Sequence, residues 1–436
     1  MQSQGNMGWW FTSAPSYMRT TPFLVCCGCQ THIISQERCG MHPTTLTVDV
    51  PSVSAPLVFE VGTIYRQFQT LTDGRKRRGV RYPLAVLLTI ALLAKLAGYS
   101  QMRAIADWAK LRAAELAELF ELPRASMPHP TTWTRVLGHA VTLDALEQLV
   151  AGLSGEPLPA EVPERGSIIV NLDGKTLRGT IPLGQTQGVH LLAAYQAEPG
   201  LVRAQVAVDA KANEIVAAPM VVNQLDLTGV VVTGDALLAQ RDLSTQIVEG
   251  GGDYFWWVKE NQPSLLADLE LLFSDEYVCA GWSAPPVDFT SARTVEKGHG
   301  RLEQRKVTAS SLLAEYHDWP YLAQVVRVER TRTTKLKVEQ AVVYGISSLP
   351  NAVADAARLL AIGRAHWRIE NGLHYRRDVT LREDGSQVRR GRAPQVLATL
   401  NNLVCSLCAR AGSRNLAELQ RVVARRLDQW LDRQHR

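Results

Sequence analysis

The chain has 436 residues, of which 46% are hydrophobic and 20% are charged, so it is long enough for two or three domains with cores of their own. Its net charge of +5 excludes no class of partner, but the charge is unevenly placed. Residues 364–436 contain 15 arginines, no lysine and seven acidic residues, a balance of +8 that leaves −3 for the rest of the chain. Guanidinium groups bind phosphate oxygens, so this segment suits DNA, although a solvated helical face explains the same charges.

No segment is predicted to cross a membrane. The longest apolar run, residues 82–99, is interrupted by Lys95 and is too short to span a bilayer, so we expect a buried helix there. The N-terminal region contains only the short apolar stretch FLVCC, which is less than a signal peptide needs. We therefore expect a cytoplasmic protein that does not contact membranes.

Residues 1–45 show no hydrophobic period, and we expect them to form a poorly ordered extension. Four of the seven cysteines lie here, namely Cys26, Cys27, Cys29 and Cys39. Their spacing fits no regular pair of CxxC zinc hooks, so zinc binding is the disfavoured alternative.

Residues 57–150 are predicted to form a helical domain, because apolar residues recur at intervals of three and four. A basic loop within it, residues 72–83, carries Arg75, Lys76, Arg77, Arg78 and Arg81. Two interpretations stay open, a DNA-binding domain or a helical cap with a solvated loop. A linker rich in proline and glycine follows at residues 153–167.

The next segment, residues 165–265, changes to short β-rich runs. Three of them follow one another closely, and then helices and strands alternate. The predicted strands are residues 167–173, 189–196, 202–209, 229–235 and 253–259. This order predicts an α/β fold, an RNase H-like mixed sheet with flanking helices. Residues 266–348 are predicted to be a β-rich insertion, and residues 350–436 to be helices that complete the core.

Two aspartates are predicted to meet at one edge of this sheet. Asp173 ends the first predicted core strand and Asp235 ends the fourth. Ends of neighbouring strands open into one crevice. Adjacent carboxylates repel each other unless a cation lies between them, and Mg²⁺ prefers such oxygen ligands. A simple turn formed by Asp173 and Gly174 is the alternative for the first aspartate.

A third carboxylate is predicted on a helix within residues 363–384. His366, Glu370, His374 and Asp378 are spaced four apart and would share one face of an α-helix. A polar stripe of this kind does not suit an ordinary core, although an exposed face would also explain it.

Several stretches resemble the insertion-sequence transposases of the H-repeat family, which belong to the DDE class. They are DGKTLRG, GDALLAQRD, GGDYFWWVKENQPSL, KGHGRLEQR and RAHWRIENGLHYRRDVTLRED. The resemblance runs from about residue 60 to residue 430, and HWRIENGLHYRRDVTLRED is its most specific part. It implies an RNase H-like catalytic domain with a β-rich insertion between the second aspartate and the glutamate. The matching triad is Asp173, Asp235 and Glu370, with spacings of 62 and 135 residues.

The resemblance also implies a chemistry and its partners. We expect two Mg²⁺ ions, for which Mn²⁺ can substitute, held by Asp173, Asp235 and Glu370. The expected reaction is cut-and-paste or related strand transfer, with double-stranded DNA (element ends and target) as the partner. We further expect a homodimer in the active DNA complex, located at the nucleoid in the bacterial cytoplasm.

Residues near the triad are predicted to contact phosphates or bases. They are Lys175, Arg178, Lys259, Asn261, Gln262, Arg364, His366 and Arg377. In the pattern of related transposases, a Tyr stands seven residues before the glutamate and an Arg stands four residues before it. A Lys stands seven residues after it. This chain has Gly363, His366 and Arg377 at those positions, which leaves hairpin chemistry at the element end undecided.

Other functions are alternatives to strand transfer. A nucleotidyltransferase would need a lysine two residues before Asp173, where this chain has Asn171. A catalytically inactive DNA-binding derivative and a metal-dependent nuclease without strand transfer both stay open, because the basic C-terminal segment suits either one.

Overall fold

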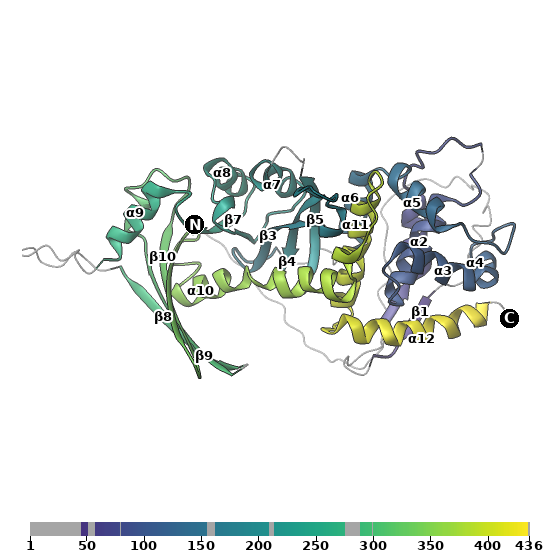
Figure 1. Ribbon diagram of the computed structural model, residues 1–436. Coiled ribbons are helices and arrows are strands. Elements are labelled where there is room, and N and C mark those ends of the chain that lie inside the picture. Colours follow the sequence, from purple (N-terminus) through teal and green to yellow (C-terminus); the bar gives the residue numbers. More distant parts are fainter. Residues whose placement is uncertain are drawn as a thin grey trace, which may run out of the picture. The chain divides into compact units, whose positions relative to one another are not determined.

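The computed structural model describes residues 45–50, 57–78, 80–154, 162–208, 213–274, 288–298 and 300–434 (Figure 1). The predicted extension and its four cysteines lie outside these ranges, except that Thr45 begins the first strand. The domain boundaries expected from the sequence stay predictions.

The N-terminal part is helical, but it starts with two paired strands. β1 (Thr45–Val48) and β2 (Leu57–Glu60) are antiparallel, so the expectation of a helical start at residue 57 is wrong. The helices that follow are α1 (Val61–Gln69), α2 (Leu84–Leu96), α3 (Met102–Leu111), α4 (Ala113–Leu119), α5 (Pro130–His139) and α6 (Leu143–Ser154). Every residue of α2 is buried, as expected of a helix that is apolar all round.

A mixed sheet forms the centre of the fold. The antiparallel neighbours β3 (Ile168–Thr176), β4 (His190–Gln196) and β5 (Leu201–Val208) make one side of it. On the other side of β3, strands β6 (Val230–Gly234) and β7 (Asp253–Val258) run parallel to it. The order β5-β4-β3-β6-β7 is that of the predicted RNase H-like core, so the predicted α/β fold class is confirmed.

The predicted β-rich insertion extends this sheet and does not form a sheet of its own. Its strands are β8 (Thr290–Gly298), β9 (Arg301–Ser310), β10 (Gln324–Thr334) and β11 (Val338–Ser347), an antiparallel meander. β11 pairs with β7 from Tyr344↔Val258 to Ser347↔Phe255. The sheet therefore contains nine strands, with β11, β10, β9 and β8 following β7.

Helices cover both faces of the core strands, with α7 and α8 on one side and α10 on the other (Figure 1). α7 (Glu214–Val222), α8 (Arg241–Glu249) and α9 (Pro263–Leu272) pack against the face that carries Val232 and Trp256. α10 (Ala356–Ala365) packs against the opposite face, which carries Val231 and Phe255. Alternate residues of the same strands thus belong to two apolar layers.

The segment after α10 departs from the predicted α-helix. η5 (Glu370–His374) and η6 (Arg376–Thr380) are π-helical turns, and η7 (Glu383–Gly385) is a short 3-10 helix. Hydrogen bonds in a π-helix run between residues five apart, so the turn is wider than in an α-helix. α11 (Ala393–Arg410) then packs against α6 and β5, and α12 (Leu416–Gln434) ends the described chain.

Within the described residues, no single helix combines the length and the apolarity that crossing a bilayer requires. The bent pair α5 and α6, which meet at 95°, reaches those criteria by length and composition alone.

Candidate metal centre

Asp173 lies inside strand β3. The prediction that it ends this strand is therefore wrong. The parallel ladder between β3 and β6 stops at the pair Asn171↔Thr233, whereas β3 continues along β4 to Thr176. Asp173 therefore lies just past the end of β6, with its side chain 32% exposed. Its Oδ1 accepts a hydrogen bond of 3.0 Å from the backbone N–H of Gly174.

Gly174 is part of the sheet, so the alternative of a simple turn formed with Asp173 is wrong. It pairs with Leu192 on β4. A side chain at residue 174 would clash with the carboxylate of Glu214 and the ring of His190, so close packing explains the glycine.

The π-helical turn η5 brings two further candidate ligands to Asp173. Nε2 of His374 lies 3.1 Å from Oδ2 of Asp173. One ligand atom from each of Asp173, Glu370 and His374 lies within 4.8 Å of the others. Glu370 is exposed, whereas His374 is only 4% exposed. The carboxylates of Asp173 and Glu370, two members of the predicted triad, therefore converge, and the imidazole of His374 lies with them.

A glycine allows η5 to lie this close to the sheet. A side chain at residue 372 would clash with the ring and hydroxyl of Tyr195 on β4. Ile369 and Leu373 are buried in the same core cluster as Tyr195. Packing of the π-helical turn onto β4 thus sets the position of Glu370 and His374.

Asp235 follows β6 and begins the short 3-10 helix η2 (Ala236–Leu238). Its Oδ1 accepts hydrogen bonds from the backbone N–H groups of Leu237 and Leu238, at 3.0 and 3.3 Å. Burial raises the pKa of Asp235, and the negative charges of Glu214 and Asp173 add to that increase. Asp235 is thus within electrostatic reach of Asp173, but it does not belong to the group of ligand atoms within 4.8 Å. A cation placed here would relieve the repulsion that raises its pKa.

His366 is enclosed at the C-terminal end of α10, and the phosphate contact expected of it stays a prediction. It is 2% exposed, and its Nδ1 lies 3.4 Å from Oγ1 of Thr233. Thr233 donates to Oδ1 of Asn171 (2.8 Å), whose Nδ2 donates to the carbonyl of Ala365 (2.8 Å). Burial lowers the pKa of His366, while the charges of Asp173 and Asp235 oppose that decrease. The ring therefore fixes α10 against β3 and β6.

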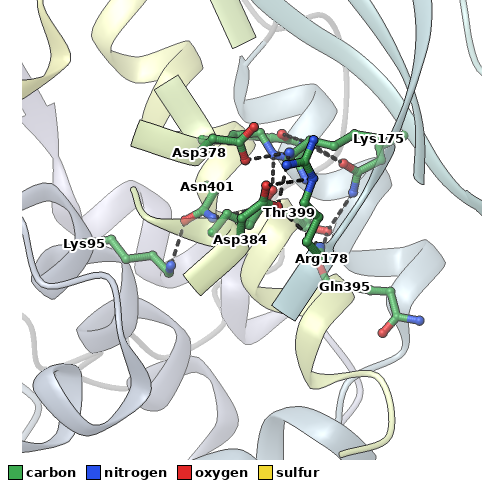
Figure 2. A network of polar contacts seen from close by, with 12 residues as sticks. Lys95, Lys175, Arg178, Asp378, Asp384, Gln395, Thr399 and Asn401 are labelled. Carbon is green, nitrogen blue, oxygen red and sulfur yellow. Dashed lines mark hydrogen bonds and ion pairs between the residues drawn. The ribbon is translucent and has the colours of Figure 1, made fainter. Parts of the chain in front are cut away.

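Lys175 and Arg178 point toward two aspartates of the C-terminal segment (Figure 2). Nζ of Lys175 lies 2.5 Å from Oδ1 of Asp378 and 3.4 Å from Oδ1 of Asp384. With its side chain 9% exposed, Lys175 links β3 to η6. Arg178 is 80% exposed, and its Nε lies 3.6 Å from Oδ2 of Asp384. A phosphate contact by Arg178 stays a prediction.

Asn261 and Gln262 hold the loop that follows Asp235. Nδ2 of Asn261 donates to the carbonyl of Ala236 (2.6 Å), and Nε2 of Gln262 donates to the carbonyl of Ala239 (2.9 Å). These amides therefore have structural partners, and their predicted DNA contacts stay predictions.

Arg377 is fully buried, and the phosphate contact expected of it stays a prediction. Its Nε donates to Oε2 of Glu383 (2.8 Å), and its Nη1 donates to Gln205 (3.1 Å) and Asn402 (3.2 Å). Asn401 extends the network, because its Nδ2 donates to Glu383 (2.8 Å) and its Oδ1 accepts from Lys95 (2.7 Å). Figure 2 shows the Lys95–Asn401 contact. The network joins η6, β5, α11 and α2.

A cleft of about 1520 Å³ opens next to Asp235. Its lining contains Asp235, Trp257, Asn371 and parts of β9, β10, β11 and α10. Its basic lining residues are Lys259, Arg301, Arg305, Arg330, Arg364, Arg368, Arg376 and Arg414. Its acidic ones are Glu198, Asp235, Glu296 and Glu303. Positive charge therefore predominates. Lys259 is exposed, whereas Nη2 of Arg364 lies 2.6 Å from Oε1 of Glu296.

Three residues around the site were not assigned a role from the sequence. His374 was noted as part of the polar stripe, and its position four residues after Glu370 was the available signal. Glu214, which contacts His190 at 2.9 Å and raises the pKa of Asp235, gave no signal. Trp367 is 64% exposed on the wall of the cleft, which only the structure reveals.

Comparison with known proteins agrees with this arrangement. Residues 164–407 match the family described as "Transposase DDE domain", and residues 65–152 match "DDE_Tnp_1-associated". The chain is 30% identical over 345 residues to "Putative transposase YncI" of Escherichia coli O157:H7, which covers 77% of this chain and 85% of that protein. This chain belongs to the H-repeat-type DDE transposase family. The family resemblance inferred from the motifs is thereby confirmed.

A second relative covers less of this DDE transposase. It is 32% identical over 248 residues to "H repeat-associated putative transposase YhhI" of Escherichia coli strain K12, which covers 55% of this chain and 63% of that protein. A solved structure, a piggyBac transposase synaptic complex with hairpin DNA, covers 85% of this chain at a TM-score of 0.39 and 8% identity. A likeness this distant carries no argument.

Membership of the DDE transposase family implies a polynucleotidyl-transferase or nuclease class of activity, DNA as a partner and divalent metal ions as cofactors. The donor atoms fit such ions. Carboxylate oxygens and an imidazole nitrogen converge at Asp173, Glu370 and His374, and the pKa of Asp235 is raised by burial and, to a lesser extent, by neighbouring negative charge.

Proposed function

We propose that this DDE transposase cleaves phosphodiester bonds at the ends of its element and joins the resulting 3′-hydroxyl ends to target DNA. The proposed cofactors are two Mg²⁺ ions, for which Mn²⁺ can substitute. The observation that carries the proposal is the convergence of Asp173 and Glu370, with Asp235 within electrostatic reach of Asp173, in a chain that matches the DDE domain over residues 164–407.

Asp173 is proposed to be the shared metal ligand. It is the carboxylate that lies close to Glu370 and also acts on the pKa of Asp235, so it faces both partners. When bound by these three side chains, two divalent ions would supply the Lewis acidity that an in-line phosphoryl displacement requires. Lys175 is proposed to hold η6 against β3 through Asp378, which keeps Glu370 in place.

The basic cleft is proposed to hold the DNA backbone. Arg330 and Lys259 are exposed residues of its lining, and Asp235 lies at its margin. Contacts between such side chains and phosphates give affinity and position but no sequence preference. We propose a homodimer in the active DNA complex, because an element has two ends and each chain supplies one triad.

An excision assay tests the proposal. The substrate is a plasmid that carries the element with its flanking DNA, with Mg²⁺ present. Asp173→Asn and Glu370→Gln should keep DNA binding, because both replacements preserve side-chain shape. Cleavage should fall to about one hundredth of the wild-type rate or lower, the scale of losing one electrostatic catalytic group.

The matched control is Asp107→Asn, which changes an exposed carboxylate on α3 and should cleave like wild type. Cleavage at the wild-type rate by either triad variant would contradict the assignment. Cleavage without joined product would indicate a nuclease, and DNA binding without cleavage by wild type would indicate an inactive derivative.

A further inference from the structure

His374 directs its one observed hydrogen bond at a proposed metal ligand. Nε2 lies 3.1 Å from Oδ2 of Asp173. Its Nδ1 is buried and has no hydrogen-bond partner among the residues that the structure describes. The neighbouring His366 differs, because its Nδ1 lies beside Thr233. The contact with Asp173 is therefore the polar interaction that the structure describes for the His374 ring.

Nε2 of His374 faces a carboxylate oxygen of Asp173, which can only accept, so Nε2 donates in this contact. A histidine binds a metal as neutral imidazole, through the nitrogen that lacks the proton. A cation shared with Asp173 would take the place of the Nε2 proton, and Nδ1 has no partner among the described residues.

The distances suit shared binding. Adjacent ligands of an octahedral ion with bonds of about 2.1 Å lie about 3.0 Å apart. Nε2 of His374 and Oδ2 of Asp173 are 3.1 Å apart, and a Glu370 oxygen lies within 4.8 Å of both. A modest rotation of the Glu370 side chain, which is exposed, would complete one face of such an ion.

The geometry points to His374 as a metal ligand beside Asp173 and Glu370, an inference that rests on the proposed metal-dependent function. One of the two metal positions then has two carboxylates and one imidazole. Because imidazole favours transition metals over Mg²⁺, this position binds Mn²⁺ more tightly with His374 than without it.

Electron paramagnetic resonance on the full chain with duplex DNA and Mn²⁺ tests this inference. Pulsed measurements detect magnetic coupling between Mn²⁺ and a directly bound nitrogen. We expect ¹⁴N coupling in wild type, and its replacement by ¹⁵N coupling when the protein contains ¹⁵N-labelled histidine. His374→Gln should lose the coupling and weaken Mn²⁺ binding by about tenfold or more, since even indirect changes around a metal cost about 10–100-fold.

His366→Gln is the matched control, because His366 is equally buried next to Asp173 but contacts Thr233; it should keep the coupling. If His374 only donated a hydrogen bond to Asp173, His374→Gln would keep the Mn²⁺ affinity of wild type. The glutamine amide can donate to Asp173 from the same distance along the side chain. The wild-type spectrum decides the matter even if His374→Gln fails to fold.

The outcomes separate this inference from the proposed function. Bound Mn²⁺ without nitrogen coupling in a wild type that excises DNA overturns the role of His374 and leaves the function intact. Nitrogen coupling that depends on His374 in a protein that never cleaves DNA supports the ligand and overturns the function. Absence of bound Mn²⁺ in wild type overturns both.

Discussion

Glu147 on α6 is a buried carboxylate away from the metal centre. Its Oε1 accepts a hydrogen bond of 3.2 Å from Nε2 of Gln205, which also belongs to the Arg377 network. Burial raises the pKa of Glu147 to about 7. The folded protein therefore binds this proton more tightly than the unfolded chain does. The resulting stabilisation is fully present below pH 4.5 and is lost as the pH rises through about 7.

Replacing Glu147 by glutamine should remove this pH dependence. At pH 8 we expect Glu147→Gln to raise the free energy of unfolding by about 1–3 kcal/mol relative to wild type, because the cost of a buried negative charge is gone. At pH 5 the two proteins should differ little. Urea unfolding at both pH values measures this, and the exposed Glu260→Gln should show no such difference. An equal effect of Glu147→Gln at pH 5 and pH 8 would refute the argument.

At the scale of elements, the π-helical segment formed by η5 and η6 has two functions. η5 carries the candidate ligands Glu370 and His374, and η6 carries one partner of a buried ion pair. Arg377 on η6 is completely buried against Glu383, while Lys175 on β3 contacts Asp378. These contacts attach the segment to the sheet and to α11. The segment is thus held at several points, which suits a site whose ligands must keep fixed positions.

Breaking the buried pair should be costly for stability. Arg377→Met leaves the carboxylate of Glu383 without its cation, which we expect to lower the free energy of unfolding by about 3–5 kcal/mol. Arg103→Met on α3, where the arginine side chain is 88% exposed, should change it by less than about 0.5 kcal/mol. Chemical denaturation measures both. Arg377→Met combined with Glu383→Leu should recover most of the loss, and a failure to recover would show that the pair is not the cause.

At the scale of the whole molecule, the cleft brings together residues from distant parts of the chain. Arg330 comes from β10, Arg364 from α10 and Arg414 from the turn after α11. The extension of the sheet by β11 places β10 where it can line the same cleft as Asp235. The inserted strands therefore form part of the wall of this cleft.

Removing an exposed arginine from this cleft should weaken DNA binding at every sequence. For Arg330→Ala we expect the slope of log affinity against log salt concentration to fall by about one, because one phosphate contact and its released counterion are lost. Titrations of duplex DNA at several salt concentrations measure this. Arg103→Ala, far along the chain on α3, should keep the wild-type slope. An unchanged slope for Arg330→Ala would place the DNA elsewhere.

Much of the core could be predicted from the sequence, because the relevant signals are local. Alternating and unbroken apolar runs follow the periods of strands and helices, so the order of three strands, helix, strand, helix and strand was predicted and then found. The motif HWRIENGLHYRRDVTLRED likewise identified the segment that carries Glu370. Residue types and short spacings carry this information within a few turns of chain.

Only the tertiary structure decided how polar side chains are used. Arg377 and His366 have the chemistry of phosphate contacts, but Gln205 and Thr233, more than a hundred residues away, enclose them. The π-helical turn depends on Gly372 meeting Tyr195, and the nine-stranded sheet depends on β11 satisfying the open edge of β7. Such partners are far apart in the chain, so local periodicity determined the elements of this protein and long-range packing determined which residues reach its metal centre.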